Sequence, residues 1–279
     1  MEYLSWFENL LKTDDFITSD KFLSCAHEFD IPYFKRDFLF RPGFWRGHLQ
    51  TPIWCQIKAL SKDGIFVGHA DQPVSLKDIQ TLKKMRVKMV YGTNIYKNRI
   101  SRSVPLGLTN DTNESALHKL FGNTKHFRFA HETYEPPSSK TFSIYANFTS
   151  KNNVQVRDNL LKTIENLPNI IYSKTEFTDQ ARIDYLKDLR ANSVVLCPEG
   201  NGIDTHRLWE TLYMGGVPII VKNDFLPAEI SQLPVIQLDS WRQILDINWL
   251  ESEYNYIRSL NFDYNLLSMS WWKEQVFRQ

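Results

Sequence analysis

The segment LCPEGNGIDTHRLWETLYMGGVPIIV, residues 196–221, decides the fold. It consists of an apolar run, a polar loop with two glycines, a helical stretch and a second apolar run. A unit of this kind is the repeating element of a parallel sheet with right-handed crossovers. Parallel sheets bind ligands beyond the carboxyl ends of their strands, so the loop after the first apolar run is the place to expect a site.

Arg207 is unusual in the first turn of the predicted helix. The first turn carries partial positive charge, and a cation there is disfavoured unless an anion lies beside it. Arg207 and Glu210 share one helix face by their three-residue spacing, and Asp204 or Thr205 is expected to cap the helix. One explanation is an exposed Arg207–Glu210 ion pair of little energetic weight. The other is a bound diphosphate, held by Arg207 and the helix end.

A second arginine favours the diphosphate. Arg157 falls near the start of a helix predicted over 153–167, which follows a strand predicted over 142–147. Both arginines follow a strand of the same predicted sheet and lie near the start of a helix, where a cation is otherwise disfavoured. We therefore predict that the two arginines share one bound anion.

The rest of the chain divides at EPPSSK, residues 135–140, because consecutive prolines and small polar residues stop regular structure. We predict a first domain over 1–137, a second over 138–260, and a C-terminal helix over 261–279 that packs back on the first domain. The predicted strands are 65–67, 87–91, 142–147, 169–173, 193–197, 217–221 and 235–238, and the predicted helices are 75–85, 153–167, 179–190 and 204–214.

Composition excludes several classes. A formal net charge of +1 gives no polyanion-binding signature, so nucleic acid is not expected as a partner. The three cysteines, Cys25, Cys55 and Cys197, have no regular spacing, which argues against a disulfide framework and a cysteine zinc site. No run approaches the roughly 18 apolar residues of a membrane span. The N-terminal 15 residues lack the features of a signal peptide. We therefore expect a soluble cytoplasmic protein, either monomer or dimer.

Three stretches together resemble the exostosin-like glycosyltransferases. SVVLCPEGNGIDTHRLWETLYMGGVPIIV (193–221) is similar to the nucleotide-sugar signature of that family, and FSIYANFTSKNNVQVRDNLL (142–161) to the strand, loop and Arg-bearing helix before it. In the first half, VGHADQP (67–73) and YGTNIYKNRISRSVPLGL (91–108) resemble the Gly-His-x-Asp and Asn…Pro-x-Gly segments of short soluble viral and bacterial members. The resemblance covers roughly residues 64 to 222.

The resemblance implies an α/β protein of the GT-B type: two Rossmann-like domains that face a cleft, with the donor nucleotide on the second and the acceptor on the first. Family members are mostly inverting, and such a displacement needs a base for the acceptor hydroxyl and stabilisation of the leaving diphosphate. GT-B enzymes usually use cations and a helix end for the second task, so no metal is expected. The residues predicted to line the donor site are Arg157, Arg207, Glu210, His206, Asn147, Gly200, Gly202, Thr205, Asp204 and Tyr172.

Asp71 is the predicted base, because it follows a strand at the end that is expected to face the cleft. His69 is the second candidate, as base or as a group that orients Asp71, and His48 is the third. The alternatives are that Asp71 only makes a turn before Pro73, and that Tyr172 in the donor set is a core residue. Glu210 is expected to accept from ribose hydroxyls.

The resemblance to chlorella-virus members of the family implies UDP-xylose as donor and fucose in a viral N-glycan as acceptor. The alternatives are a GDP-fucose-type fucosyltransferase and a non-catalytic glycan-binding module. A P-loop nucleotide hydrolase is disfavoured, because EGNGIDTH (199–206) lacks the Gly-Lys-Ser/Thr that holds phosphates and magnesium.

Overall fold

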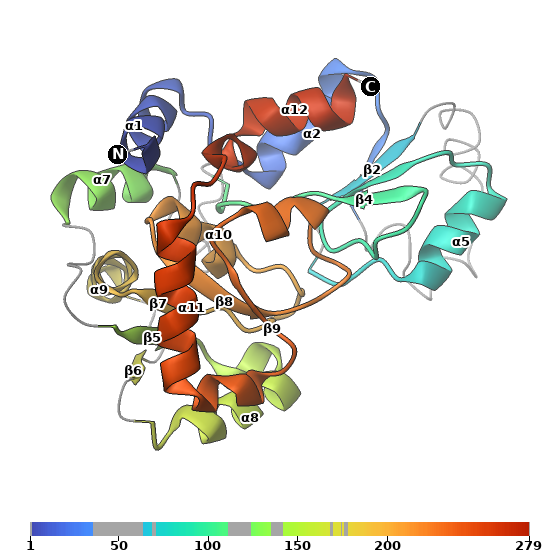
Figure 1. Ribbon diagram of the computed structural model, residues 1–279. Helices are drawn as coiled ribbons and strands as arrows, with labels where there is room; N and C mark the ends of the chain where they lie inside the picture. The colour runs from blue at the N-terminus through green and yellow to red at the C-terminus, as the bar shows by residue number, and fades with distance from the viewer. Residues whose placement is uncertain are drawn as a thin grey trace.

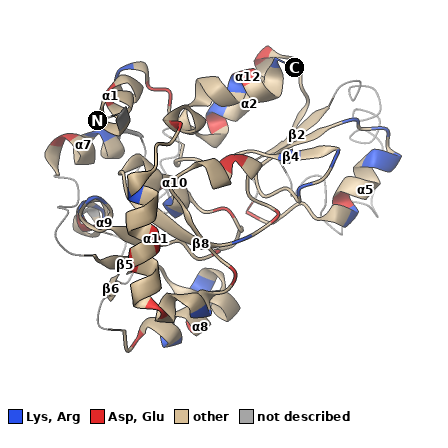
Figure 2. Cartoon of the chain, viewed as in Figure 1, with Lys and Arg blue, Asp and Glu red and all other residues tan. Residues whose placement is uncertain are grey.

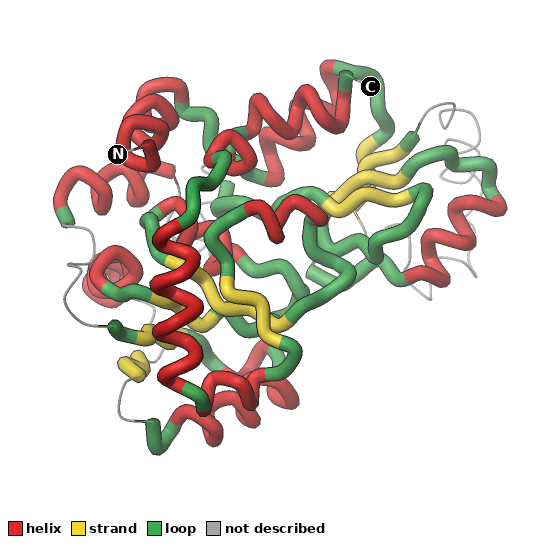
Figure 3. Tube along the Cα trace, in the orientation of Figure 1, coloured by secondary structure: helices red, strands yellow, loops and turns green. Residues whose placement is uncertain are grey.

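The computed structural model describes residues 2–35, 64–68, 71–110, 124–134, 142–167, 170–173, 175 and 178–278. Within these residues the strands form two parallel sheets, which appear as separate groups of arrows and tubes (Figures 1 and 3). The predicted α/β class is confirmed, and the arrangement is compatible with two Rossmann-like units. Lys and Arg are scattered along the ribbon together with Asp and Glu, as the small net charge predicts (Figure 2).

The second sheet has the strand order β6-β5-β7-β8-β9, with every neighbouring pair parallel. Its strands and helices lie within a few residues of the predicted ranges. The strands are β5 (Ile144–Asn147), β6 (Ile170–Ser173), β7 (Val194–Leu196), β8 (Val217–Val221) and β9 (Ile236–Leu238), and the intervening helices are α8 (Val154–Ile164), α9 (Asp179–Ala191) and α10 (His206–Tyr213).

This strand order contains a topological switch point between β5 and β7. The chain leaves β5 in one direction, to β6, and leaves β7 in the other, to β8. Side chains alternate between the two faces of β5, so Ile144 and Ala146 pack with Leu160 of α8, whereas Tyr145 packs with Leu208 of α10. The helices that follow β5 and β7 therefore lie on opposite faces of the sheet, and open α/β sheets bind ligands between such helices.

The first sheet follows the order of the chain: β1 (Tyr33–Lys35), β2 (Ile65–Gly68), β3 (Val90–Gly92) and β4 (Ser101–Ser103), all parallel. One face is covered by α5 (Leu76–Lys84), which begins at the predicted Ser75–Asp78 capping box. The other face is covered by α2 (Ser19–Glu28) and by the C-terminal α12 (Met269–Phe277). The last helix thus packs on the first sheet (Figure 1).

The first 137 residues do not all pack on the first sheet. α1 (Glu2–Thr13) and α7 (Thr124–Thr133) bury Phe7 and Phe127 in the cluster that also holds Tyr213 of α10, on the second sheet. The amphipathic pattern of α1 was visible in the sequence, but the partner of its apolar face was not. The predicted boundary after residue 137 lies outside the described residues.

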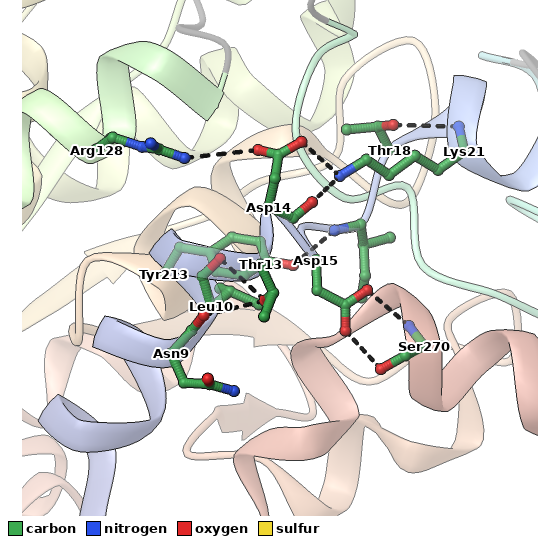
Figure 4. Close-up of polar contacts among 11 residues, drawn as sticks. Asn9, Leu10, Thr13, Asp14, Asp15, Thr18, Lys21, Arg128, Tyr213 and Ser270 are labelled. Carbon is green, nitrogen blue, oxygen red and sulfur yellow. Dashed lines mark hydrogen bonds and ion pairs between the residues drawn. The ribbon is translucent and has the colours of Figure 1, made fainter.

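A polar junction joins the two ends of the chain. The backbone N–H of Ser270, in α12, donates to Asp15 at 2.9 Å, and Asp14 faces Lys21 and Arg128 (Figure 4). The remaining elements are α11 (Ile247–Ser259), which covers the α8 face of the second sheet, and the short 3-10 helices η1 (Ser150–Asn152), η2 (Ala228–Gln232), η3 (Trp241–Leu245) and η4 (Tyr264–Leu267). Among the described residues, the helices are too short or too polar to cross a bilayer.

Candidate functional site

The two predicted arginines meet at the switch point. Arg157 is in the second turn of α8 and Arg207 in the first turn of α10, and the pKa of Arg157 is lowered partly by the charge of Arg207. Each side chain is only 5% exposed. The structure therefore brings two cations together, below the surface, at the carboxyl edge between β5 and β7.

Arg157 fixes the loops on both sides of the switch point. Its Nε donates to the carbonyl of Glu199 at 2.8 Å, its Nη2 to that of Pro198 at 3.2 Å, and its Nη1 to that of Thr149 at 2.9 Å. A Cβ added at Gly200 would lie 2.9 Å from Nη2, so the loop also needs glycine for this close approach. Burial, followed by the charge of Arg207, lowers the pKa of Arg157 to about 10. Arg157 thus links the two loops by hydrogen bonds and also places positive charge at the carboxyl edge of the second sheet.

Arg207 has no such ties. Among the described residues its guanidinium makes no hydrogen bond and no ion pair, and its Nε is buried without an acceptor. Its Cζ lies 5.8 Å from the centre of the Tyr185 ring. Burial favours a lower pKa for Arg207, but the acidic groups around it, first Tyr185 and Cys197 and then Glu210, raise the pKa above its ordinary value.

The structure corrects the interpretation of Glu210. Its side chain is fully buried, so the exposed Arg207–Glu210 ion pair is excluded, and so is direct contact with ribose hydroxyls in this conformation. Oε2 accepts a hydrogen bond from the hydroxyl of Tyr185, and Oε1 is buried without a partner. Burial raises the pKa of Glu210 to about 7.

Asp204 and Thr205 differ from the predicted capping pattern. Thr205 occupies the N-cap of α10 but makes no side-chain cap hydrogen bond. Asp204, 2% exposed, accepts from the backbone N–H of Leu106 and from Nε1 of Trp209, both at 2.8 Å. Burial raises the pKa of Asp204 to about 7. Its carboxylate is engaged in these contacts, so it is not placed to hold a sugar.

His206 also points to the first half of the chain, since its Nδ1 lies 2.7 Å from the carbonyl oxygen of Gly107. The predicted contact between His206 and a phosphate stays a prediction. At the end of β5, Asn147 donates to Ser173 Oγ at 2.7 Å and accepts from Thr175 Oγ1 at 3.0 Å. Tyr172 is 43% exposed, which excludes the core role, and its hydroxyl donates to the carbonyl of Phe148.

Gly202 lies where the two sheets meet. A Cβ at this residue would fall 2.5 Å from the backbone oxygen of Asp71, so the loop after β2 touches the loop after β7. Asn94, after β3, accepts at Oδ1 from the N–H groups of Ile203 (3.1 Å) and Asp204 (2.7 Å). The carboxyl ends of the two sheets therefore face each other, which places the exposed Asp71 beside the loop that carries Gly200 and Gly202.

The loops after β2 and β3 touch the loop after β7 directly. The cleft between two domains that the resemblance implies therefore stays a prediction. The other two candidate bases, His69 and His48, lie outside the described residues. Within the described part of the chain there is no group of three or more His, Cys, Asp or Glu side chains that could hold a metal.

A pocket opens on the other side of β7, beyond the ends of β7 and β8. Glu199, Leu208 and Trp241 are among its lining residues, and its cavity volume is about 10 Å³, which is room for about one water molecule. Glu199 accepts from Asn223 Nδ2 at 3.2 Å, and burial raises its pKa. The pocket places an aromatic ring and a carboxylate next to the loop that Arg157 holds.

Sequence reasoning missed Tyr185, Asn94 and Trp241. Tyr185 lies beside Leu186 and one turn before Leu189 in α9, and this apolar spacing indicates a core residue. Asn94 follows a buried strand in YGTN, a segment used for the resemblance, but its acceptor role depends on the second sheet. Nothing in the sequence places Trp241 at a pocket. No family model matches this sequence, and a search of curated proteins found no match.

Proposed function

We propose that the chain binds a nucleoside-diphosphate sugar at the β5–β7 switch point and transfers the sugar to a hydroxyl of a glycan acceptor. The observation that carries the proposal is Arg207, a buried cation without a polar partner among the described residues. Near pH 7 Tyr185 and Cys197 are uncharged, so Glu210 alone offsets this cation, and a buried charge without a hydrogen-bonded partner costs several kcal/mol. A ligand that supplies the counter-charge explains why such a residue lies there.

A diphosphate suits this site better than a single carboxylate. Two guanidinium groups and the N-terminus of α10 converge on the edge, and α10 begins without a side-chain cap at Thr205. Helix N-termini and arginines both favour phosphate groups.

The reaction proposed is an inverting displacement. Asp71, exposed beside Gly202, takes the proton of the acceptor hydroxyl as it attacks the sugar. The bond between sugar and diphosphate breaks, and Arg207 and the helix end stabilise the charge on the leaving group, with Arg157 adding positive potential. UDP-xylose as donor, fucose as acceptor, metal independence and the GT-B arrangement enter this proposal from the resemblance alone. The cytoplasm as compartment is supported by Cys25 and Cys197, which are free and buried.

The test is calorimetric titration of the wild-type chain with UDP, GDP, CMP, UDP-xylose, UDP-glucose, UDP-GlcNAc and GDP-fucose, with and without magnesium, beside the Arg207→Ala variant. We expect UDP-containing ligands to bind, independently of magnesium, and Arg207→Ala to lose that binding. Selective binding of GDP and GDP-fucose identifies a fucosyltransferase-type donor site instead. Absence of binding by every nucleotide refutes the transferase and leaves the non-catalytic glycan-binding module.

A further inference from the structure

Arg207 and Glu210 are unlike an ordinary helical ion pair. Residues three apart on a helix are neighbours and opposite charges at this spacing normally pair. Here both side chains are buried, yet no hydrogen bond or ion pair joins them, and Nε of Arg207 and Oε1 of Glu210 are both left without a partner. Something in the fold must keep the carboxyl group from the guanidinium.

Tyr185 of α9 contacts both groups. Its hydroxyl donates to Oε2 of Glu210, and the centre of its ring lies 5.8 Å from Cζ of Arg207. The ring face of a tyrosine attracts a cation, while the hydroxyl fixes the direction of the carboxyl group. One buried side chain thus sets the position of the cation and the orientation of its nearest acid.

We propose that Tyr185 is a positioning residue of the anion site: it holds the Glu210 carboxyl group away from Arg207, so that the guanidinium stays available to a phosphate, and Glu210 takes up a proton when the phosphate binds. The proton comes from solvent and goes to the unpaired Oε1 of Glu210. This inference rests on the proposed function, because it describes the regulation of that same site.

The side chains around Glu210 have pKa values far from neutral pH, whereas that of Glu210 is close to it. Tyr185 faces it from α9, Cys197 from the end of β7 and Arg207 from its own helix, while Tyr145 of β5 faces Arg207 and Tyr185. Burial raises the pKa of Cys197 and of Tyr145 to about 12, and burial and Glu210 raise that of Tyr185. Among these groups only the pKa of Glu210, about 7, lies in the working range. The pKa of Asp204 is also about 7, but its carboxylate accepts from Leu106 and Trp209. A phosphate next to Arg207 raises it further, so anion binding weakens as pH rises above 7.

UDP-glucose is the probe for this proposal, because both of its phosphates are esterified and do not titrate between pH 6 and 9. Calorimetry at pH 7.5 in two buffers of different ionisation enthalpy gives the number of protons taken up. We expect about half a proton per ligand for the wild-type chain and none for Glu210→Gln. We also expect the affinity of the wild-type chain to fall between pH 7 and 9, and that of Glu210→Gln to stay level.

Tyr185→Phe keeps the ring and removes the hydroxyl. We expect its affinity for UDP-glucose at pH 7.5 to fall about tenfold, because the freed carboxylate pairs with Arg207. In the Glu210→Gln background the same substitution should have no further effect. Tyr145→Phe, which removes the hydroxyl that contacts Ser173, is the matched control and should bind as the wild type does.

Two failures are distinguishable. If the wild-type chain binds UDP-glucose but takes up no proton, or if Tyr185→Phe binds it with unchanged affinity and pH dependence, the positioning role is refuted and the donor site stands. If the wild-type chain binds neither UDP-glucose nor any other nucleotide of the panel, the donor site is refuted and the positioning role with it. Urea unfolding of each variant shows whether a loss of affinity is only a loss of folded protein.

Discussion

Replacing each arginine of the switch point by methionine should have opposite effects on stability. Methionine keeps the apolar stem of arginine and removes its charge and donors. In Arg157→Met, three backbone carbonyls, of Thr149, Pro198 and Glu199, lose their donor. An unsatisfied buried acceptor costs about 1–3 kcal/mol, so we expect the free energy of unfolding to fall by about 3 kcal/mol or more.

In Arg207→Met no hydrogen bond within the described part of the chain is lost. The contact with the Tyr185 ring is worth about 1–2 kcal/mol when desolvated, whereas an uncompensated buried charge costs several kcal/mol. At pH 7 Tyr185 and Cys197 are uncharged, so Glu210 alone offsets the cation. We expect the ligand-free variant to be as stable as the wild type, or more stable by up to about 2 kcal/mol.

The assay is urea unfolding at pH 7 without nucleotide, followed by tryptophan fluorescence, with UDP binding measured on the same samples. The site hypothesis requires Arg207→Met to keep its stability and lose UDP binding. A loss of stability in Arg207→Met as large as in Arg157→Met would refute the reasoning, because it would show that Arg207 holds the fold together and has no free donors for a ligand.

Three further outcomes follow from the contacts. Asn94→Ala removes the acceptor of the Ile203 and Asp204 N–H groups, so it should lower stability by about 2 kcal/mol and weaken UDP binding. Gly202→Ala places a Cβ against the Asp71 carbonyl, so sugar transfer should fall, with UDP affinity measured alongside and expected to fall less. Glu210 has a pKa raised from 4.5 to about 7, so its contribution to stability is complete below pH 4.5 and is lost as pH rises through 7. Unfolding of Glu210→Gln from pH 4 to 8 should lack this decline of about 3 kcal/mol.

The sequence predicted the parts of the fold that local periodicity controls. The strands and helices from β5 to β9 were found because buried parallel strands are short apolar runs and helices repeat at three and four residues. β1 and β4 were missed, because their sequences, YFK and SRS, are not apolar runs. The meeting of Arg157 and Arg207 was predicted from the rule that strand ends share one edge.

The depth of each residue could not be predicted. An arginine and a glutamate three apart look like an exposed face, but every residue of α10 from Arg207 to Tyr213 is buried. The cover comes from α1, α7 and α9, which arrive from far along the chain. The sequence therefore predicted that Glu210 contacts a ligand, whereas in the structure Glu210 is a buried acid.

Among the described residues Arg207 lacks a polar partner, and this is informative because the backbone before it is fixed. Residues 198 and 199 are held by Arg157, residues 203 and 204 by Asn94, and His206 by the carbonyl of Gly107. Asn94 and Gly107, which follow β3 and β4, thus fix the chain up to the residue before Arg207. The ring of Tyr185 contacts the guanidinium of Arg207. A loose loop would let an arginine reach water or a carboxylate. In a segment fixed at this many points the guanidinium is preorganised, and preorganised charge binds a complementary group at the lowest cost in reorganisation.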